Sequence, residues 1–145
     1  MSKSTKKNNS EEISSNLFAS ATLFQVSPIN KKPVEISFTE ERTSSDGGLL
    51  LLKEIETNIG IISSIAGCVR DNRHAGYVRH SVESMISQRV FQIAAGYEDT
   101  NDCDTLKDDA VLKICSSKLP QTESSLASQP TMCRLENQPS RMELY

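Results

Sequence analysis

Apolar and polar positions alternate with the period of a helix over much of the chain, most clearly in its middle. Between residues 77 and 95, apolar side chains recur every three or four positions, which is typical of a helix with one face in the core. This stripe consists of Val78, Val82, Met85, Ile86, Val90, Ile93 and Tyr97, and the opposite face carries His80, Glu83, Ser84, Ser87 and Gln88. We predict a core-facing helix over about Tyr77 to Ala95, which Gly96 ends.

Two shorter helices are predicted before this one. Polar residues able to cap a helix cluster at 43–46. Apolar residues then recur at helical spacing as far as Gly60, namely Leu51, Leu52, Ile55 and Ile59. The run from Ile61 to about Cys68 predicts a second helix, and a loop follows over 70–76.

Two further helices are predicted near the end of the sequence. The first spans about Asp104 to Cys115, with Asp102 or Asp104 as its cap. Pro130 preorganises the first turn of the second, over 131–137, where Met132 and Leu135 face inward. Residues 140–143 have the Ser-x-x-Glu form of a capping box, so another helix is expected to begin there.

The first part of the chain has a different character. Residues 1–33 are rich in Ser, Lys and Asn and hold five Lys against two Glu, which favours a disordered basic arm. Val34, Ile36 and Phe38 alternate with polar residues, a pattern that predicts one short strand. We therefore predict a mainly α fold, with an arm over 1–33 and a helical region over 34–145.

Composition limits the protein class. The 145 residues suggest one domain at most, and no apolar run approaches the roughly 20 residues of a membrane helix. No secretory signal is visible, so we expect a soluble, cytoplasmic protein. The net charge of −3 conceals a balance of +2 over 69–97 and −5 over 98–109. A polyanion would have to avoid this second, acidic segment.

Metal and catalytic motifs are not found. The four Cys are widely separated, and no spacing selects a ligand set from His74, His80 and Cys103. Read as a calcium loop from Asp99, the acidic segment has Asp104 where Gly is needed and Ala110 where Glu is needed. We predict no catalytic residue, no metal ligand and no cofactor within this chain.

Arginines between positions 70 and 89 are the strongest candidates for binding. The guanidinium group matches phosphate oxygens, so we predict that Arg70, Arg73, Arg79 and Arg89 contact DNA. Thr131 and Arg134 on the last predicted helix are further candidates. A solvated loop and helix edge is the alternative explanation of the arginines. The 14-residue link from Cys115 to Pro130 is longer than a helix-turn-helix motif allows.

Three blocks resemble the N-terminal region of a family of bacterial insertion-sequence DDE transposases. They are TSSDGGLLLLKEI at 43–55, RHSVESMISQRVFQIAAGYEDTNDCDTLKDDAVL at 79–112 and LASQPTMCRLEN at 126–137. The resemblance covers about Val34 to Tyr145. The sequence departs from the family at Cys103, where His is usual, and at Ala110, where Pro is usual.

The resemblance implies a role in DNA transposition. In such enzymes three carboxylates of an RNase H-like domain bind two divalent metals such as Mg²⁺ and drive strand cleavage and transfer. These carboxylates lie downstream of the matched region, so we expect a chain cut short by a frameshift or stop, without strand-transfer activity alone. Expected partners are the element's DNA ends, a second copy of the chain, or full-length transposase. The alternatives are an interaction module that pairs with and inhibits full-length transposase, and a decayed fragment without function.

Overall fold

The protein is mainly helical, as the sequence predicted. A computed structural model describes residues 26–34, 36, 44–121 and 124–138. A two-stranded antiparallel hairpin, β1 (Val26–Ile29) and β2 (Lys32–Val34), precedes the helices. The helices are α2 (Leu49–Ile59), α3 (Ile61–Cys68), α4 (Val82–Ala94), α5 (Asp102–Leu106), α6 (Ala110–Cys115) and α7 (Gln129–Glu136), with a 3-10 turn η1 (Ala75–Tyr77) before α4.

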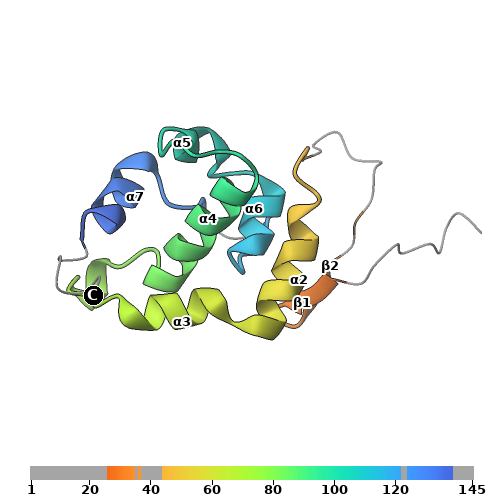
Figure 1. The fold of residues 1–145 in the computed structure, drawn as a ribbon, viewed down its shortest axis with the longest axis horizontal. Helices are drawn as coiled ribbons and strands as arrows, with labels where there is room; N and C mark the ends of the chain where they lie inside the picture. Colours follow the sequence, from red (N-terminus) through yellow and green to blue (C-terminus); the bar gives the residue numbers. More distant parts are fainter. Residues whose placement is uncertain (1–25, 35, 37–43, 122–123, 139–145) are drawn as a thin grey trace, which may run out of the picture.

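Helix α4 lies in the middle of the molecule (Figure 1). It contacts α3, α6 and α7, while α2 packs on α6 and on the hairpin. The helix begins at Val82, later than predicted, because Ser81 has an extended backbone and its side chain accepts the Ser84 N–H. Gly96, with φ of 92°, follows its end as predicted.

The predicted faces of α4 are partly wrong. Val90 and Ile93 are exposed, whereas Ser87 and Gln88 from the predicted polar face are buried, as is Gln92. Ser87 Oγ donates to the Cys115 carbonyl at 2.9 Å. Gln88 hydrogen-bonds to the Ala127 backbone in the segment before α7, and buried polar side chains are tolerated when such partners exist.

Helix α2 buries only its first residues, Leu49 and Leu50. The apolar residues that recur at helical spacing, Leu51, Leu52, Ile55 and Ile59, are between 42% and 61% exposed. The helix has Gly48 at its N-cap without a side-chain cap, so the predicted capping cluster is not used. Gly60 ends the helix as predicted, in the left-handed conformation with φ of 73°.

The helix predicted over 104–115 is two helices, α5 and α6. The helix is interrupted at 107–109, and Asp109 caps α6 by accepting the Leu112 N–H at 2.9 Å. Asp102 and Asp104 lie in the first turn of α5 and are not its N-cap, which is Asn101. Helix α7 is close to the prediction, with Pro130 in its first turn and both Met132 and Leu135 buried.

The hairpin differs from the arm and the strand that the sequence predicted. Residues 26–33 belong to it, so the prediction of a disordered arm is wrong there. Val26 pairs with Val34 across a turn in which Asn30 and Lys31 have positive φ. Strand β2 ends at Val34, where the predicted strand was expected to begin. Residues 37–39 of the predicted strand lie outside the described residues, as do residues 1–25 and the capping box at 140–143. No helix among the described residues is long and apolar enough to cross a membrane.

Candidate nucleic-acid interface

A groove of about 760 Å³ runs between the loop before α4, the segment at 124–128 and helix α7. Four of the six predicted DNA contacts line it, namely Arg73, Arg79, Thr131 and Arg134. Lys107, His80 and Tyr77 line it as well. None of the described residues that line this basic groove is Asp or Glu. The structure therefore gathers cations from three separate segments into one concave surface.

Helix α7 places Thr131 and Arg134 in the groove. These residues are three positions apart, so they lie on one side of the helix, while Met132 between them is fully buried. The segment before α7 is fixed to α4 because the Gln88 amide makes two hydrogen bonds with the Ala127 backbone, each of 2.9 Å. This wall of the groove therefore depends on a buried contact.

Arg73 lies on the opposite wall and is already paired. Its Nε and Nη2 atoms each donate to a carboxylate oxygen of Asp71 at 2.8 Å. The Arg73 side chain, with its backbone N–H, lowers the pKa of Asp71 to about 2. A further contact of 3.9 Å joins Arg73 Nη1 to Met85 Sδ on α4. The pair holds the loop in place, but Asp71 offsets much of its positive charge.

Arg79, Lys107 and Arg134 carry the uncompensated positive charge of the groove. Arg79 and Arg134 are exposed and Lys107 is half-buried. Within the described part of the chain, their charged ends make no ion pair. Such cations are available to phosphate oxygens without first breaking an internal contact.

His80 adds no charge to the groove at neutral pH. Burial lowers its pKa, and the neighbouring Lys118, Arg73 and Arg79 lower it further. Lys118 Nζ lies 3.1 Å from His80 Nδ1. Because an ammonium group only donates, Nδ1 must accept, which places the proton of the neutral ring on Nε2.

Arg89 and Arg70 do not line the groove. The Arg89 side chain is 18% exposed and contacts Glu136 Oε1 at 2.6 Å. It also donates to the carbonyls of Tyr97 and Glu98, so it connects α4 with α7 and with the turn after Gly96. Arg70 is exposed beside the groove, and its carbonyl accepts a hydrogen bond from Gln138, which is a lining residue.

Sequence reasoning missed Lys107 and Tyr77. Lys107 is the single cation of the acidic segment 98–109, which we expected polyanions to avoid. The chain turn between α5 and α6 brings it to the groove. Tyr77 was assigned to the start of a helix, whereas it ends the 3-10 turn and is 86% exposed.

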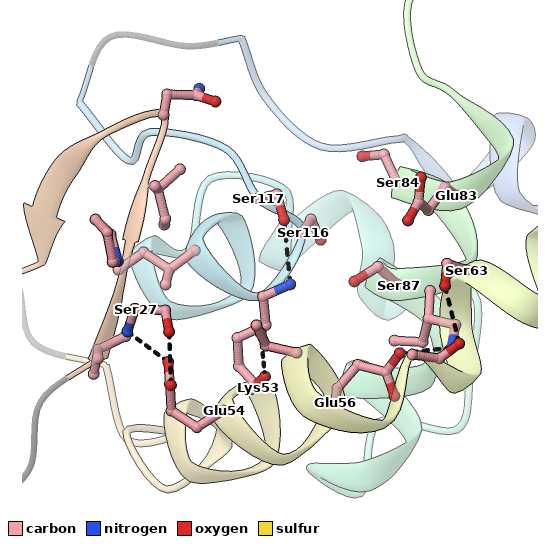
Figure 2. Close-up of a pocket in the computed structure, with 18 of the residues that line it drawn as sticks. Ser27, Lys53, Glu54, Glu56, Ser63, Glu83, Ser84, Ser87, Ser116 and Ser117 are labelled. Atoms are coloured by element: carbon pink, nitrogen blue, oxygen red, sulfur yellow. Dashed lines mark hydrogen bonds between the residues drawn. The ribbon is translucent and has the colours of Figure 1, made fainter.

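A second pocket has the opposite charge. It encloses about 470 Å³ between the hairpin and helices α2, α3, α4 and α6 (Figure 2). Glu54, Glu56 and Glu83 line it together with Lys53 and several serines. Figure 2 shows Lys53 reaching Ser117 and Glu54 reaching Ser27. The surplus of carboxylates makes this pocket unsuitable for phosphate.

The acidic segment makes local contacts. Both carboxylate oxygens of Asp99 accept hydrogen bonds from Asn101, from its backbone N–H and its side-chain amide respectively. These bonds lower the pKa of Asp99. Among the described residues, no group of three His, Cys, Asp or Glu side chains is placed to hold a metal ion.

Residues 26–145 match the family described as Transposase DDE domain group 1. The chain therefore belongs to this family, and the resemblance to DDE transposases is confirmed. No curated protein and no solved structure matches the chain.

One departure from the family pattern has a visible consequence. Cys103, where the resemblance led us to expect His, is fully buried, and its Sγ donates to Gln92 Oε1 at 3.2 Å. Gln92 Nε2 has no hydrogen-bond partner in the described part of the chain. The thiol therefore satisfies one end of a buried amide, whose donor stays unpaired.

Proposed function

We propose that this chain binds DNA in transposition and that the basic groove is its contact surface. The observation that carries the proposal is the convergence of Arg79, Lys107 and Arg134 on one groove whose described lining contains no carboxylate. Membership of a transposase family supports DNA as the polyanion. The ends of the insertion sequence are the natural ligand in such a role.

The groove suits phosphate contacts better than reading of bases. Its cations come from a loop, a helix-helix turn and one side of α7, and such scattered cations can follow a phosphate backbone. Arg73 is held by Asp71 and contributes less. We assign binding rather than strand cleavage to this region. Divalent metal chemistry is proposed only for the family's catalytic carboxylates.

The experiment is a comparison of single charge removals. The variants Arg79→Ala, Lys107→Ala and Arg134→Ala are titrated into a labelled duplex by fluorescence anisotropy. Loss of one phosphate contact lowers the salt slope by about 1, which corresponds to about eightfold weaker binding at about 0.1 M salt. Lys32→Ala removes the same charge from the exposed hairpin and is the matched control.

Two results would contradict the proposal. Equal losses in Lys32→Ala and in the groove variants would assign binding to overall charge. Nicking of element-end DNA by the purified 145-residue chain with Mg²⁺ would contradict the restriction to binding.

A second candidate function is self-association through α2. The exposed face of this helix is apolar, with Leu51, Leu52, Ile55 and Ile59 outward. Its charged residues are instead tied to the body of the protein. Lys53 donates to Ser117, Glu54 accepts from Ser27, and Glu56 accepts the Ile62 N–H at 2.6 Å. This arrangement is the reverse of a solvated surface helix.

A second copy of the chain is the partner that we propose for this face. Past Gly60, Ile61 and Ile65 add two more half-exposed side chains. The six present an apolar area on the order of 500 Å², near the upper end for a monomer. With a polar rim it approaches the roughly 800 Å² per partner of a stable interface. An uncharged face can meet its own copy across a two-fold axis without repulsion.

Sedimentation velocity tests this second candidate. Wild type and Thr57→Lys, which adds a charge on the other side of α2, are expected to be dimers, whereas Ile55→Lys, with the same charge change on the same helix, is expected to be a monomer. A monomeric wild type at micromolar concentration, or an Ile55→Lys dimer, would refute self-association through α2.

A further inference from the structure

Tyr77 projects an aromatic ring at the wall of the basic groove. Its side chain is 86% exposed, the largest fraction among the exposed large apolar side chains of the described residues. The other tyrosine described there, Tyr97, donates its hydroxyl to Asp46 instead. A single exposed apolar residue is ordinary, so a binding role for Tyr77 has to be argued from the residues around it.

The turn that carries Tyr77 is held by local contacts. The Tyr77 N–H donates to the His74 carbonyl at 2.9 Å. His74 Nδ1 accepts the Gly76 N–H, and the ring centroids of His74 and Tyr77 are 5.4 Å apart. The aromatic ring is therefore presented at small entropic cost on binding.

One arginine precedes Tyr77 in the sequence and another follows it. Arg73 and Arg79 line the same groove as Tyr77. Arg73 is anchored to Asp71 and to Met85 on α4, which fixes the loop that carries the ring. Basic side chains that follow a phosphate backbone beside an exposed aromatic ring are the combination used to bind unpaired nucleotides.

We infer that Tyr77 stacks on an unpaired base of a DNA strand whose phosphates lie in the basic groove. This inference rests on the proposed DNA-binding function and names its ligand class as DNA with a single-stranded segment next to the duplex. Stacking requires no hydrogen-bond readout, so the contact accepts any base.

The experiment compares a blunt duplex with the same duplex carrying a short single-stranded tail. A 2-aminopurine in the tail reports stacking through loss of its fluorescence. Tailed DNA is expected to bind about 5- to 160-fold more tightly than blunt DNA, the range for one base on an aromatic ring. Fluorescence is expected to fall on binding.

Three variants assign the effect to the ring. Tyr77→Ala is expected to abolish both the gain from the tail and the fluorescence loss. Tyr77→Phe keeps the ring and is expected to keep both. Ile93→Ala removes an exposed apolar side chain from α4 outside the groove and is the matched control.

The outcomes separate this inference from the function on which it rests. Salt-dependent binding of blunt DNA without a gain from the tail overturns stacking alone. A gain that survives in Tyr77→Ala also overturns it. Binding of neither DNA overturns both the inference and the proposed function.

Discussion

Replacement of Gln88 by Ala removes the contact that fixes one wall of the groove. The Gln88 side chain is 1% exposed. Its Nε2 donates to the Ala127 carbonyl and its Oε1 accepts the Ala127 N–H, each at 2.9 Å. Both partners are backbone groups of a residue that is also buried, and water cannot readily replace the lost side chain.

The expected cost follows from the two backbone groups left behind. A buried donor or acceptor without a partner costs about 1–3 kcal/mol, so the pair costs about 2–6 kcal/mol. That is a large part of the roughly 5–15 kcal/mol by which a folded domain is stable. Gln88→Ala is therefore expected to be among the most destabilising polar substitutions in this chain.

Urea denaturation followed by circular dichroism measures the loss. With a slope of about 2 kcal/mol per molar urea, a loss of about 4 kcal/mol lowers the midpoint by about 2 M. Gln121→Ala replaces an exposed Gln and is expected to change stability by less than about 0.5 kcal/mol. A midpoint change in Gln88→Ala no larger than in Gln121→Ala would refute the reasoning.

Three further predictions follow from other buried or strained positions. Burial raises the pKa of the Cys115 thiol to about 12 from its usual value near 9. The unfolded chain therefore loses this proton first, and the free energy of unfolding is expected to fall as pH rises from about 9 towards 12. At about pH 8 a thiol reagent is expected to modify the exposed Cys68 but to reach Cys115 only after unfolding, and equal rates would contradict this. Gly60→Ala places a side chain at φ of +73° and is expected to cost about 1–2 kcal/mol in thermal unfolding, unlike Gly47→Ala, which meets no atom within 4 Å. Arg89→Ala is expected to lower stability by about 1.5–3 kcal/mol in urea denaturation without changing the salt slope of DNA binding, and a changed slope would instead place Arg89 at the DNA.

Local features of the sequence predicted the parts of the fold that depend on neighbouring residues. Gly60 and Gly96 end their helices because each adopts a positive φ, a property of glycine itself. Pro130 begins α7, and the spacing of Met132 and Leu135 gives its buried side. These features act within one or two helical turns, so a single sequence contains them.

Packing between distant segments could not be predicted in the same way. Ser87 and Gln88 face the core, where they hydrogen-bond to Cys115 and Ala127. These partners lie 28 and 39 residues away in the sequence, so the helix pattern could not indicate them. Helix periodicity shows that an apolar stripe exists, but it does not show which neighbour covers it. The apolar stripe of α2 is an example, because its four residues are exposed.

Some residues of the candidate site could be proposed from the sequence, and others could not. Arg73 and Arg79 were proposed because of their guanidinium chemistry, and both line the groove. Arg89 was included with them, although its partner Glu136 lies 47 residues away and directs it elsewhere. Lys107 was missed because polyanions were expected to avoid the acidic segment that contains it, whereas its side chain lines the groove.

The salt dependence of DNA binding tests the central claim most directly. Three phosphate contacts by Arg79, Lys107 and Arg134 predict a slope of about −2.7 for the logarithm of affinity against the logarithm of salt concentration. Affinity for duplex DNA is then expected to fall about 40-fold between about 50 and 200 mM salt. Removal of all three cations is expected to flatten the slope by about 2.7, and an unchanged slope in this triple variant would contradict the assignment of DNA binding to the basic groove.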